Sequence, residues 1–300
     1  SVGSGKYSGA ALSDFPVLVR LSSATGFAFS DFTTPAAELR FADANGESLD
    51  FEIDTWDSAS GTALVWVSVP SLSSSTAITA YFAPASGASL PAVSSTAVWT
   101  KADYIGVWHF NDADGTSHVD ATGNGLTATP RTTAFTKLAS AVIGGGFQAA
   151  GTGAFLPSEV IKTFADCKTN YTGEAWVNRN GTTANQQILR SGDGWNNGAG
   201  LRLNDRIYYG SKNYNQWGGG YPVPSSDWTH LVAAWTDQSG QGYVRMNGAA
   251  ILTNVARYDS DTDFSAFSLT SRTSGNEPFL GYVDEFRLRR GVSSEDWSRA

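Results

Sequence analysis

Short segments in which apolar and polar residues alternate recur along the chain, and they constrain its fold more than any other feature. Turn residues separate them, as in Asp43–Gly46 and Ser58–Gly61. An alternation of period two places successive side chains on opposite faces of a strand, so each segment predicts a β-strand. In the first half these segments are Pro16–Leu21, Glu38–Asp43, Ser48–Trp56, Ala63–Pro70 and Ala77–Ala83.

The second half repeats this pattern, and helical spacing is not sustained for three turns anywhere in the chain. Only Ser293–Arg299 is typical of a short terminal helix. Many short strands separated by turns predict an all-β protein built from sandwiches or jelly rolls. The strands expected in this half are Asp103–Phe110, Tyr171–Arg179, Thr229–Asp237, Gly242–Asn247 and Phe279–Leu288.

A change in composition divides the 300 residues into two domains. Between Pro84 and Ala97 the sequence consists mainly of Ala, Ser, Gly and Pro, which indicates a linker. We place the boundary near Val98. The sequence therefore predicts an N-terminal antiparallel β-sandwich over residues 1–97 and a second β-sandwich over residues 98–300.

The charge balance limits the classes of partner. The net charge is −8, and only 20 residues are Lys or Arg, which argues against binding to nucleic acid or to an anionic membrane surface. Charged residues make up only 16% of the chain, whereas Gly reaches 32 residues and Trp 10. This composition is typical of a turn-rich extracellular β protein.

Two further features bear on the location of the protein. Cys167 is the single cysteine, so an internal disulfide is excluded. No apolar run is long enough to span a bilayer, so no direct membrane insertion is expected in this segment, and the chain starts at Ser1 without Met. We expect a mature chain or an excised ectodomain that is extracellular, periplasmic or on the cell surface, with further domains or a membrane anchor as an open alternative.

Asp284 interrupts an apolar row in the last predicted strand. The alternate positions Leu280, Tyr282, Phe286 and Leu288 share one face with it. Burying an unpaired carboxylate costs several kcal/mol, so this group needs a partner. Two alternatives follow: backbone N–H groups cap Asp284, or a cation binds it.

The order and spacing of several segments in the last two hundred residues resemble the LamG-like, concanavalin A-type jelly roll of secreted bacterial proteins, which includes lectins and glucanases. The resemblance implies that the second domain is such a jelly roll. The segments that carry it are Val107–Asp112, Tyr171–Val177, Asp227–Val232, Gly242–Gly248, Phe279–Arg287 and Gly291–Trp297.

The N-terminal half resembles a bacterial domain of unknown function that often precedes LamG-like domains. That family also occurs in the ectodomains associated with ExbB/TolQ-type proton channels. The segments that carry this resemblance are Asp14–Leu21, Glu38–Asp43, Leu49–Asp54 and Val65–Pro70.

The LamG resemblance implies a structural calcium ion in many family members. Calcium prefers hard oxygen ligands, chiefly carboxylates and carbonyls. We carry the site onto Asp120, Asn124 and Asp284, and we add Asp112 from the opening strand. The alternative is a set of metal-free carboxylates that accept hydrogen bonds from turn N–H groups.

A concentration of aromatic residues between Ser191 and Pro224 indicates carbohydrate binding, because it is interleaved with Asn, Gln and Gly. Sugars present apolar C–H faces and hydroxyl groups, so their sites combine aromatic rings with polar side chains. The alternative is that single aromatic residues cover the edge of the sandwich. The predicted carbohydrate ligands are Trp195, Asn196, Arg202, Tyr209, Tyr214, Trp217 and Tyr221.

The acidic run Glu52–Asp57 resembles the catalytic strand of laminarinase-type glycoside hydrolases, which use two carboxylates. The match fails because Asp57 stands where that family has Glu, and because the run lies in the N-terminal half. Phe51 and Ile53 alternate with Glu52 and Asp54, which favours an amphipathic strand. No other catalytic motif is present, so we predict no catalytic residue and no enzyme.

Three functional hypotheses remain. The first is a non-catalytic ectodomain that binds a polysaccharide or glycan. The second is an adhesion or sensory module that binds protein and is coupled to an ExbB/TolQ-type channel. The third is a laminarinase-like glycoside hydrolase. Because concanavalin A-like folds carry all these functions, the fold alone does not decide between them.

Overall fold

The structure is a computed structural model, and it divides the chain into two compact units. One unit holds Ser1–Thr100 together with Ala300, and the other holds Lys101–Arg299. The described residues are 7–82, 90–112, 117–130, 136–150, 154–155, 170–180, 186–191, 200–203, 207–210, 222–236, 242–255, 267–271 and 277–300.

The N-terminal unit contains two three-stranded antiparallel sheets, as the alternating segments predict. One sheet has the order β1 (Leu12–Ser22), β5 (Thr62–Leu72), β4 (Phe51–Asp57). The other has the order β3 (Ser48–Leu49), β2 (Leu39–Ala42), β6 (Thr79–Phe82). Phe41 and Val67 are fully buried in this unit, whereas the short helix α1 (Pro35–Glu38) lies in a connection.

The second half of the predicted linker is packed rather than free. Residues 83–89 lie outside the described residues, but Pro91 accepts a hydrogen bond from Arg40 Nε at 2.8 Å. Ser94 N donates to Asp50 Oδ1 at 2.7 Å, and Trp99 is fully buried. Residues 91–99 thus pack against the N-terminal unit, because Arg40 and the indole of Trp99 need buried partners that this unit provides.

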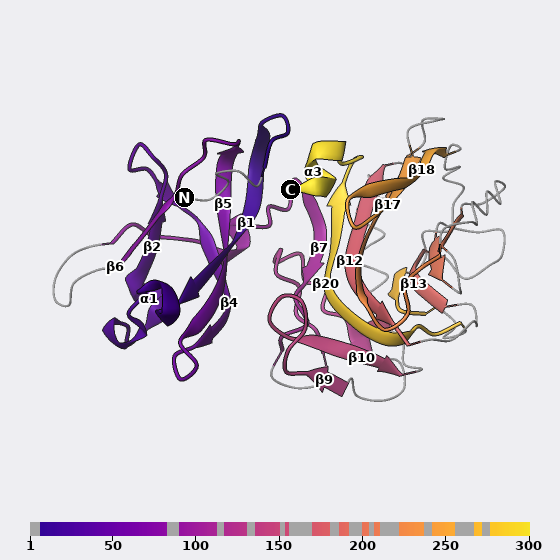
Figure 1. The fold of residues 1–300 in the computed structure, drawn as a ribbon, viewed down its shortest axis with the longest axis horizontal. Helices are drawn as coiled ribbons and strands as arrows, with labels where there is room; N and C mark the ends of the chain where they lie inside the picture. The colour runs from indigo at the N-terminus through magenta and orange to yellow at the C-terminus, as the bar shows by residue number, and fades with distance from the viewer. Residues whose placement is uncertain are drawn as a thin grey trace. The chain divides into compact units, whose positions relative to one another are not determined.

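The C-terminal unit contains an eight-stranded sheet, and β20 is its most connected strand (Figure 1). Strand β12 pairs with β20 along one side, while β7 and β10 share the other side. Strands β16, β17 and β18 continue the sheet beyond β12. The bounds are β7 Tyr104–Trp108, β9 Thr136–Leu138, β10 Gly146–Ala150, β12 Tyr171–Arg179, β16 Trp228–Trp235, β17 Gly242–Met246, β18 Ala249–Val255 and β20 Leu280–Arg290.

A six-stranded sheet forms the second layer of this unit. Its order is β15 (Ile207–Gly210), β14 (Gly200–Leu203), β13 (Gln186–Ser191), β19 (Phe267–Leu269), β11 (Ala154–Phe155), β8 (Thr129–Pro130). The core lies between the two sheets: Ala175 and Leu231 of the larger sheet belong to the same buried cluster as Leu189 and Leu201 of the smaller one. The two layers confirm the predicted β-sandwich, whose short final helix is α3 (Glu295–Arg299).

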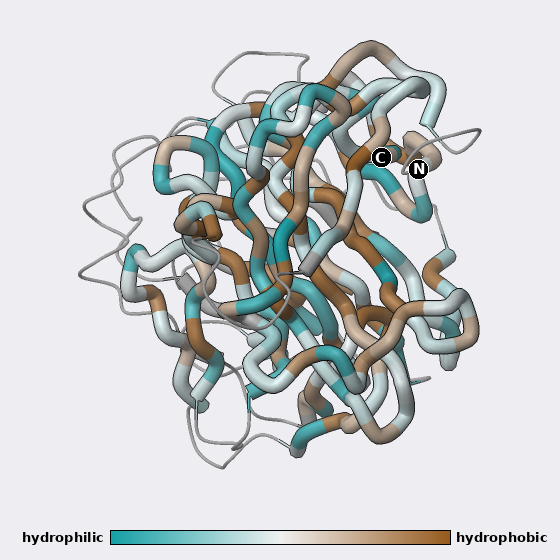
Figure 2. The backbone as a smooth tube through the Cα atoms, turned by 90° about the vertical axis from the view of Figure 1, so that its left-hand side faces the viewer, coloured by the Kyte–Doolittle hydropathy of each residue, from teal (hydrophilic) through white to brown (hydrophobic). Residues whose placement is uncertain are grey.

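Hydrophobic and hydrophilic residues alternate along many strands of the backbone tube (Figure 2). In β12 this alternation is regular, because Ala175 and Val177 are buried while Trp176 and Asn178 are half-buried. Each strand of the larger sheet thus has a core face and an outer face, and the outer face of β12 carries polar side chains. Among the described residues, no helix is both long and apolar enough to cross a membrane.

Candidate functional site

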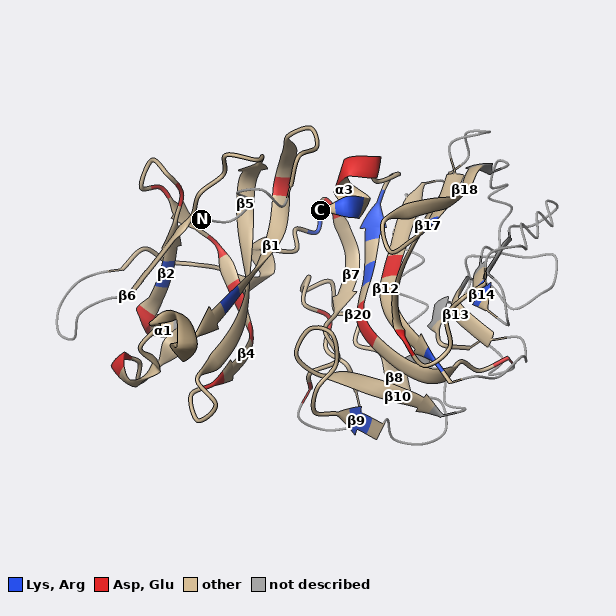
Figure 3. Cartoon of the chain, in the orientation of Figure 1, with Lys and Arg blue, Asp and Glu red and all other residues tan. Residues whose placement is uncertain are grey.

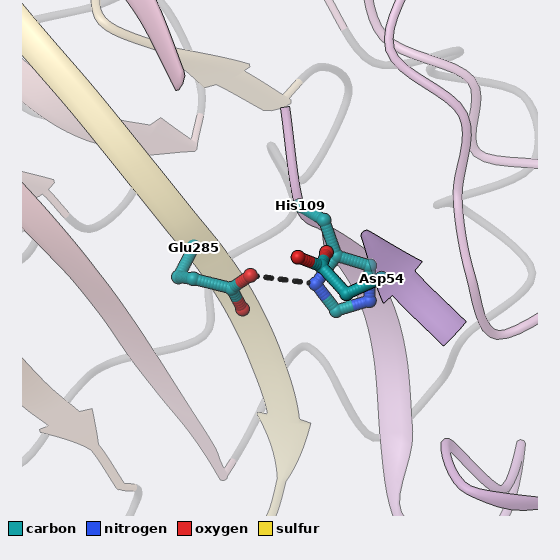
Figure 4. A group of neighbouring side chains, drawn as sticks. All are labelled: Asp54, His109 and Glu285. Atoms are coloured by element: carbon teal, nitrogen blue, oxygen red, sulfur yellow. Dashed lines mark hydrogen bonds and ion pairs between the residues drawn. The ribbon is translucent and has the colours of Figure 1, made fainter. Parts of the chain in front are cut away.

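A chain of charged contacts crosses the outer face of the eight-stranded sheet. His230 Nε2 of β16 lies 3.6 Å from Glu174 Oε2 of β12, and Arg287 Nη1 of β20 lies 3.2 Å from Glu174 Oε1. Arg287 Nη2 also donates to Glu285 Oε2 at 2.8 Å. Glu285 Oε1 forms a hydrogen bond of 2.8 Å with His109 Nδ1, and Figure 4 shows this contact.

Figure 3 shows acidic and basic segments on the neighbouring strands β12 and β20. The ion pairs among these residues shift the pKa values of Glu285 and Arg287 in the direction opposite to the effect of burial. Burial raises the pKa of Glu285, but His109 and Arg287 lower it by more, so the net shift is downward. Burial lowers the pKa of Arg287, but Glu285 and Glu174 raise it by more. Arg287 and the two carboxylates beside it, Glu174 and Glu285, therefore favour their ionised forms.

A β-bulge places Glu285 in this chain of contacts. The pairing of β12 with β20 shifts register between Glu174 and Trp176, so β20 has one extra residue there. Glu285 has a φ of 49°, in the left-handed region that a residue with a side chain rarely adopts. The bulge keeps Phe286 in the core and turns the Glu285 carboxylate toward Arg287 on the outer face.

An aromatic and amide patch occupies the same outer face, next to the charged residues. The ring of Trp176 stacks on that of His230 with centroids 5.0 Å apart. Four more residues of this patch are register partners on neighbouring strands, and all four are half-buried. They are Gln148 on β10, Tyr282 on β20, Asn178 on β12 and Trp228 on β16.

Asp120, a predicted calcium ligand, accepts several hydrogen bonds from the protein itself. Its carboxylate accepts from Val107 N at 3.1 Å, Leu126 N at 3.2 Å, and both the N–H and the hydroxyl of Thr122. The bonds fasten the turn after β7 to that strand. Calcium needs surrounding oxygen ligands, so a carboxylate enclosed by N–H and O–H donors does not fit this ion in the present arrangement.

The other predicted metal ligands are also engaged separately. Asp112 contacts His118 Nδ1 at 2.9 Å and Val119 N at 3.1 Å, while Asn124 Nδ2 donates to the carbonyl of Ile105 at 3.0 Å.

Asp284 is fully buried, and its Oδ2 accepts from Ile143 N at 2.8 Å, which is the N–H contact that the sequence allows as an alternative to a cation. In the described part of the chain, the carboxylates of Asp112, Asp120 and Asp284 do not all lie within 4.8 Å of one another. Calcium binding stays untested, and the N–H contacts of Asp120 and Asp284 favour the metal-free alternative.

Most of the predicted carbohydrate ligands lie outside the described residues. These are Trp195, Asn196, Tyr214, Trp217 and Tyr221. Arg202 lies in the middle of β14 and is buried. Tyr209 lies in β15, where its backbone pairs with Leu201.

Sequence reasoning misses two residues beside Arg202. Gln187 of β13 is its register partner, and Glu277 bonds to Gln187 through backbone and side chain. The signal for Gln187 is the pair of Gln residues that comes directly before the apolar Ile188 and Leu189 in this strand. Glu277 gives no signal, because it lies in a connection before Pro278.

His230 differs from its predicted environment. The sequence predicts a strand over Thr229–Asp237 in which His230 is a core residue with a hydrogen-bond partner, but His230 is half-buried on the outer face and contacts Glu174 and Trp176. The hydrolase candidates Glu52 and Asp57 have separate partners in the N-terminal unit. Glu52 Oε2 accepts from Trp99 Nε1 at 2.5 Å, and Asp57 Oδ1 accepts from two turn N–H groups at 3.0 Å.

Comparisons with protein families match both halves of the chain. The concanavalin A-like lectin/glucanases superfamily matches residues 148–297, and a domain of unknown function (DUF2341) matches residues 35–123. Both matches confirm the arrangement predicted from the sequence. A comparison with curated proteins finds no match.

Solved structures share the fold at low sequence identity. Domain 4 of AbnA, an extracellular arabinanase from Geobacillus stearothermophilus solved with arabinotriose, is 22% identical with a TM-score of 0.50; the match covers 65% of this chain and 96% of that domain. Trypanosoma rangeli sialidase in complex with sialic acid is 15% identical with a TM-score of 0.51, over 83% of this chain and 41% of the sialidase. The chain thus spans less than half of the sialidase.

Proposed function

Because the chain belongs to the concanavalin A-like lectin/glucanases superfamily, we propose that its C-terminal unit binds a polysaccharide or glycan and catalyses no reaction. The arabinanase domain supports the ligand class, because it is solved with a bound oligosaccharide and nearly all of it matches this chain. We also propose that the protein acts outside the cytoplasm, where polysaccharides are accessible.

The pairing of three strands supports the proposed location of the carbohydrate site. Arg190, Gly200 and Gly210 are register partners on β13, β14 and β15. Since these neighbouring strands are antiparallel, the segments that follow Ser191 and Gly210 start at the same end of the sheet. These two segments carry the predicted aromatic ligands.

Arg202 strengthens this location, because it lies on β14, between the strands from which the two segments start. A guanidinium group on β14 and neighbouring chain segments rich in aromatic residues suit a sugar, which needs both an apolar platform and hydrogen-bond donors. The proposed ligand residues are therefore those predicted from the sequence, with Arg202 as the described member.

The absence of catalysis is proposed from the contacts of the acidic candidates. Glu52 is bound to a buried indole and Asp57 to turn amides, and the hydrogen bonds from Ser60 lower the pKa of Asp57. A glycosidase needs one carboxyl with a raised pKa to serve as the general acid. Incubation with β-glucans tests this point, and release of reducing ends that is lost in Glu52→Gln would overturn it.

Affinity electrophoresis in gels that contain arabinan, β-glucan or mucin tests the binding proposal with the whole chain. We expect retardation by at least one polysaccharide, and about fivefold weaker binding in Trp195→Ala or Trp217→Ala, since one stacked aromatic ring contributes roughly 1 kcal/mol. Trp297→Ala is the matched control, because Trp297 lies in the terminal helix α3. Migration of the wild type unchanged in every gel would contradict the proposal.

A further inference from the structure

The outer face of the six-stranded sheet holds two buried polar side chains opposite each other. Leu201 and Leu203 of β14 belong to the core, so Arg202 between them is directed to the opposite face. Its register partner on β13 is Gln187. Arg202 is only 8% exposed and Gln187 only 3% exposed, although neither belongs to the hydrophobic core.

Glu277 holds Gln187 at two points. The backbone N–H of Gln187 donates to the carbonyl of Glu277 at 2.9 Å, and Gln187 Nε2 donates to Glu277 Oε2 at 2.5 Å. An ionised carboxylate only accepts hydrogen bonds, so it binds the NH₂ group of the amide and thereby sets the amide orientation. As a result Gln187 Oε1 points away from Glu277.

Gln187 Oε1 is buried, and among the residues that the structure describes none donates a hydrogen bond to it. A buried acceptor without a donor costs roughly 1–3 kcal/mol, and such atoms are rare in folded proteins. Glu277, which sets this orientation, has a φ of 51° in the left-handed region. Strained residues of this kind gather at ligand sites, where the surrounding structure holds them in place.

The chemistry of the pair restricts the ligand. The acceptor Gln187 Oε1 and the nearby Glu277 carboxylate disfavour an anion, whereas the guanidinium of Arg202 disfavours a cation. A neutral hydroxyl group satisfies both sides, because it donates to an amide oxygen and accepts from a guanidinium. Cross-strand partners have Cβ atoms about 5 Å apart, which suits neighbouring hydroxyls of one sugar ring.

We infer that Gln187 and Arg202 form a hydroxyl-binding subsite for a neutral sugar on the outer face of β13 and β14, with Glu277 as the residue that positions Gln187. This inference rests on the proposed carbohydrate binding and adds the specificity-determining residues. Gln187 selects a sugar with a hydroxyl at the contacted position, since a ligand without that hydroxyl leaves the acceptor buried and unsatisfied.

The experiment compares the whole chain with its Gln187→Met variant, using the polysaccharide that retards the wild type and a panel of neutral oligosaccharides derived from it. Methionine keeps the length of the side chain but removes the acceptor. We expect binding to weaken about 10- to 100-fold. Asn45→Met, which replaces an exposed amide in the N-terminal unit, is the matched control and should bind within about twofold of the wild type.

Monodeoxy oligosaccharides separate a direct contact from a structural effect. Wild type should discriminate against one monodeoxy analogue by about tenfold or more, and Gln187→Met should lose this discrimination. Glu277→Gln leaves the side-chain amide of Gln187 in place but no longer sets its orientation, because the new amide at position 277 can donate as well as accept, so this variant should bind with intermediate affinity. This variant also keeps the test decisive if Gln187→Met does not fold, as judged by circular dichroism.

The outcomes are distinct. If wild type binds and both variants keep its affinity and its discrimination, the subsite is wrong, and Gln187 Oε1 serves a buried water instead. If wild type binds no polysaccharide or oligosaccharide, the proposed function fails and the subsite fails with it.

Discussion

Glu174 lies between His230 and Arg287, and its position makes the C-terminal unit sensitive to acid. Burial raises its pKa, but the contacts with His230 and Arg287 lower it by more, to about 2 from an ordinary value of 4.5. Because the folded pKa is the lower one, this carboxylate stabilises the fold above pH 4.5 and loses that contribution as pH falls toward 2.

We therefore expect Glu174→Gln to lower the free energy of unfolding at pH 7 by about 3 kcal/mol, and we expect this difference to shrink below pH 4.5. Urea unfolding between pH 7 and pH 2 measures it. Glu295→Gln is the control, because Glu295 also contacts an arginine but is 54% exposed. A difference that stays constant with pH would contradict the role of the Glu174 charge.

The contacts of Asp120 and Asp284 lead to a second prediction. Both carboxylates accept backbone N–H bonds, and these donors favour the metal-free alternative. We expect EDTA to leave the melting temperature unchanged, as followed by circular dichroism with and without added calcium. A fall of several degrees in EDTA that calcium reverses would establish a bound ion instead.

Individual side chains are only partly predictable from this sequence. Asp284 stands out because it interrupts an apolar row, and its need for a partner follows from the cost of burying charge. The identity of that partner, Ile143 N, does not follow, because Ile143 is 141 residues away in the chain. Gln187 is missed for the same reason: only its tertiary contact with Glu277 gives the amide its orientation.

At the scale of single elements, the pairing of β12 with β20 depends on Gly281. A Cβ atom at this position would lie 2.2 Å from the carbonyl oxygen of Asn178, which is backbone that does not move aside. We expect Gly281→Ala to lower the free energy of unfolding by about 3 kcal/mol or more. Denaturant unfolding measures the loss.

Gly291→Ala is the matched control for this prediction. Gly291 has a φ of 73°, but a Cβ there would meet no atom within 4 Å. Only the backbone strain remains, which costs about 1–2 kcal/mol. If both substitutions cost the same, the close approach of the two strands at Gly281 would not be the cause.

The strands are the part of this protein that the sequence predicts best, because the alternation of apolar and polar residues indicates which face of a strand is buried. Ser48–Trp56 is expected as one strand and forms β3 and β4, while Phe279–Leu288 becomes β20. The bulges escape this reasoning. The extra residue at Glu285 follows from the pairing of β20 with β12, which no local pattern encodes.

At the scale of the whole molecule, β7 is required by the C-terminal sheet. It pairs with Phe286, Arg287 and Leu288 of β20, and Trp108 at its end is fully buried. We expect a fragment of residues 101–300 to unfold cooperatively on heating, and a fragment of residues 124–300 to lack a cooperative transition, because it leaves β20 without this partner.

Calorimetry and dispersion of the amide NMR spectrum measure both fragments. The full chain is the reference for the melting temperature of the C-terminal unit. A cooperative transition of residues 124–300 at the temperature of the longer fragment would contradict the requirement for β7.

The position of β7 also bears on how such proteins arise. This strand lies in the segment that matches the domain of unknown function, residues 35–123, yet it completes the sheet of the unit that matches the lectin superfamily. The border between the two sequence families is therefore not a border between folding units. Gene fusion or module shuffling at that family border would deliver a jelly roll without its opening strand, so the two segments have to be inherited together or be separated near Lys101.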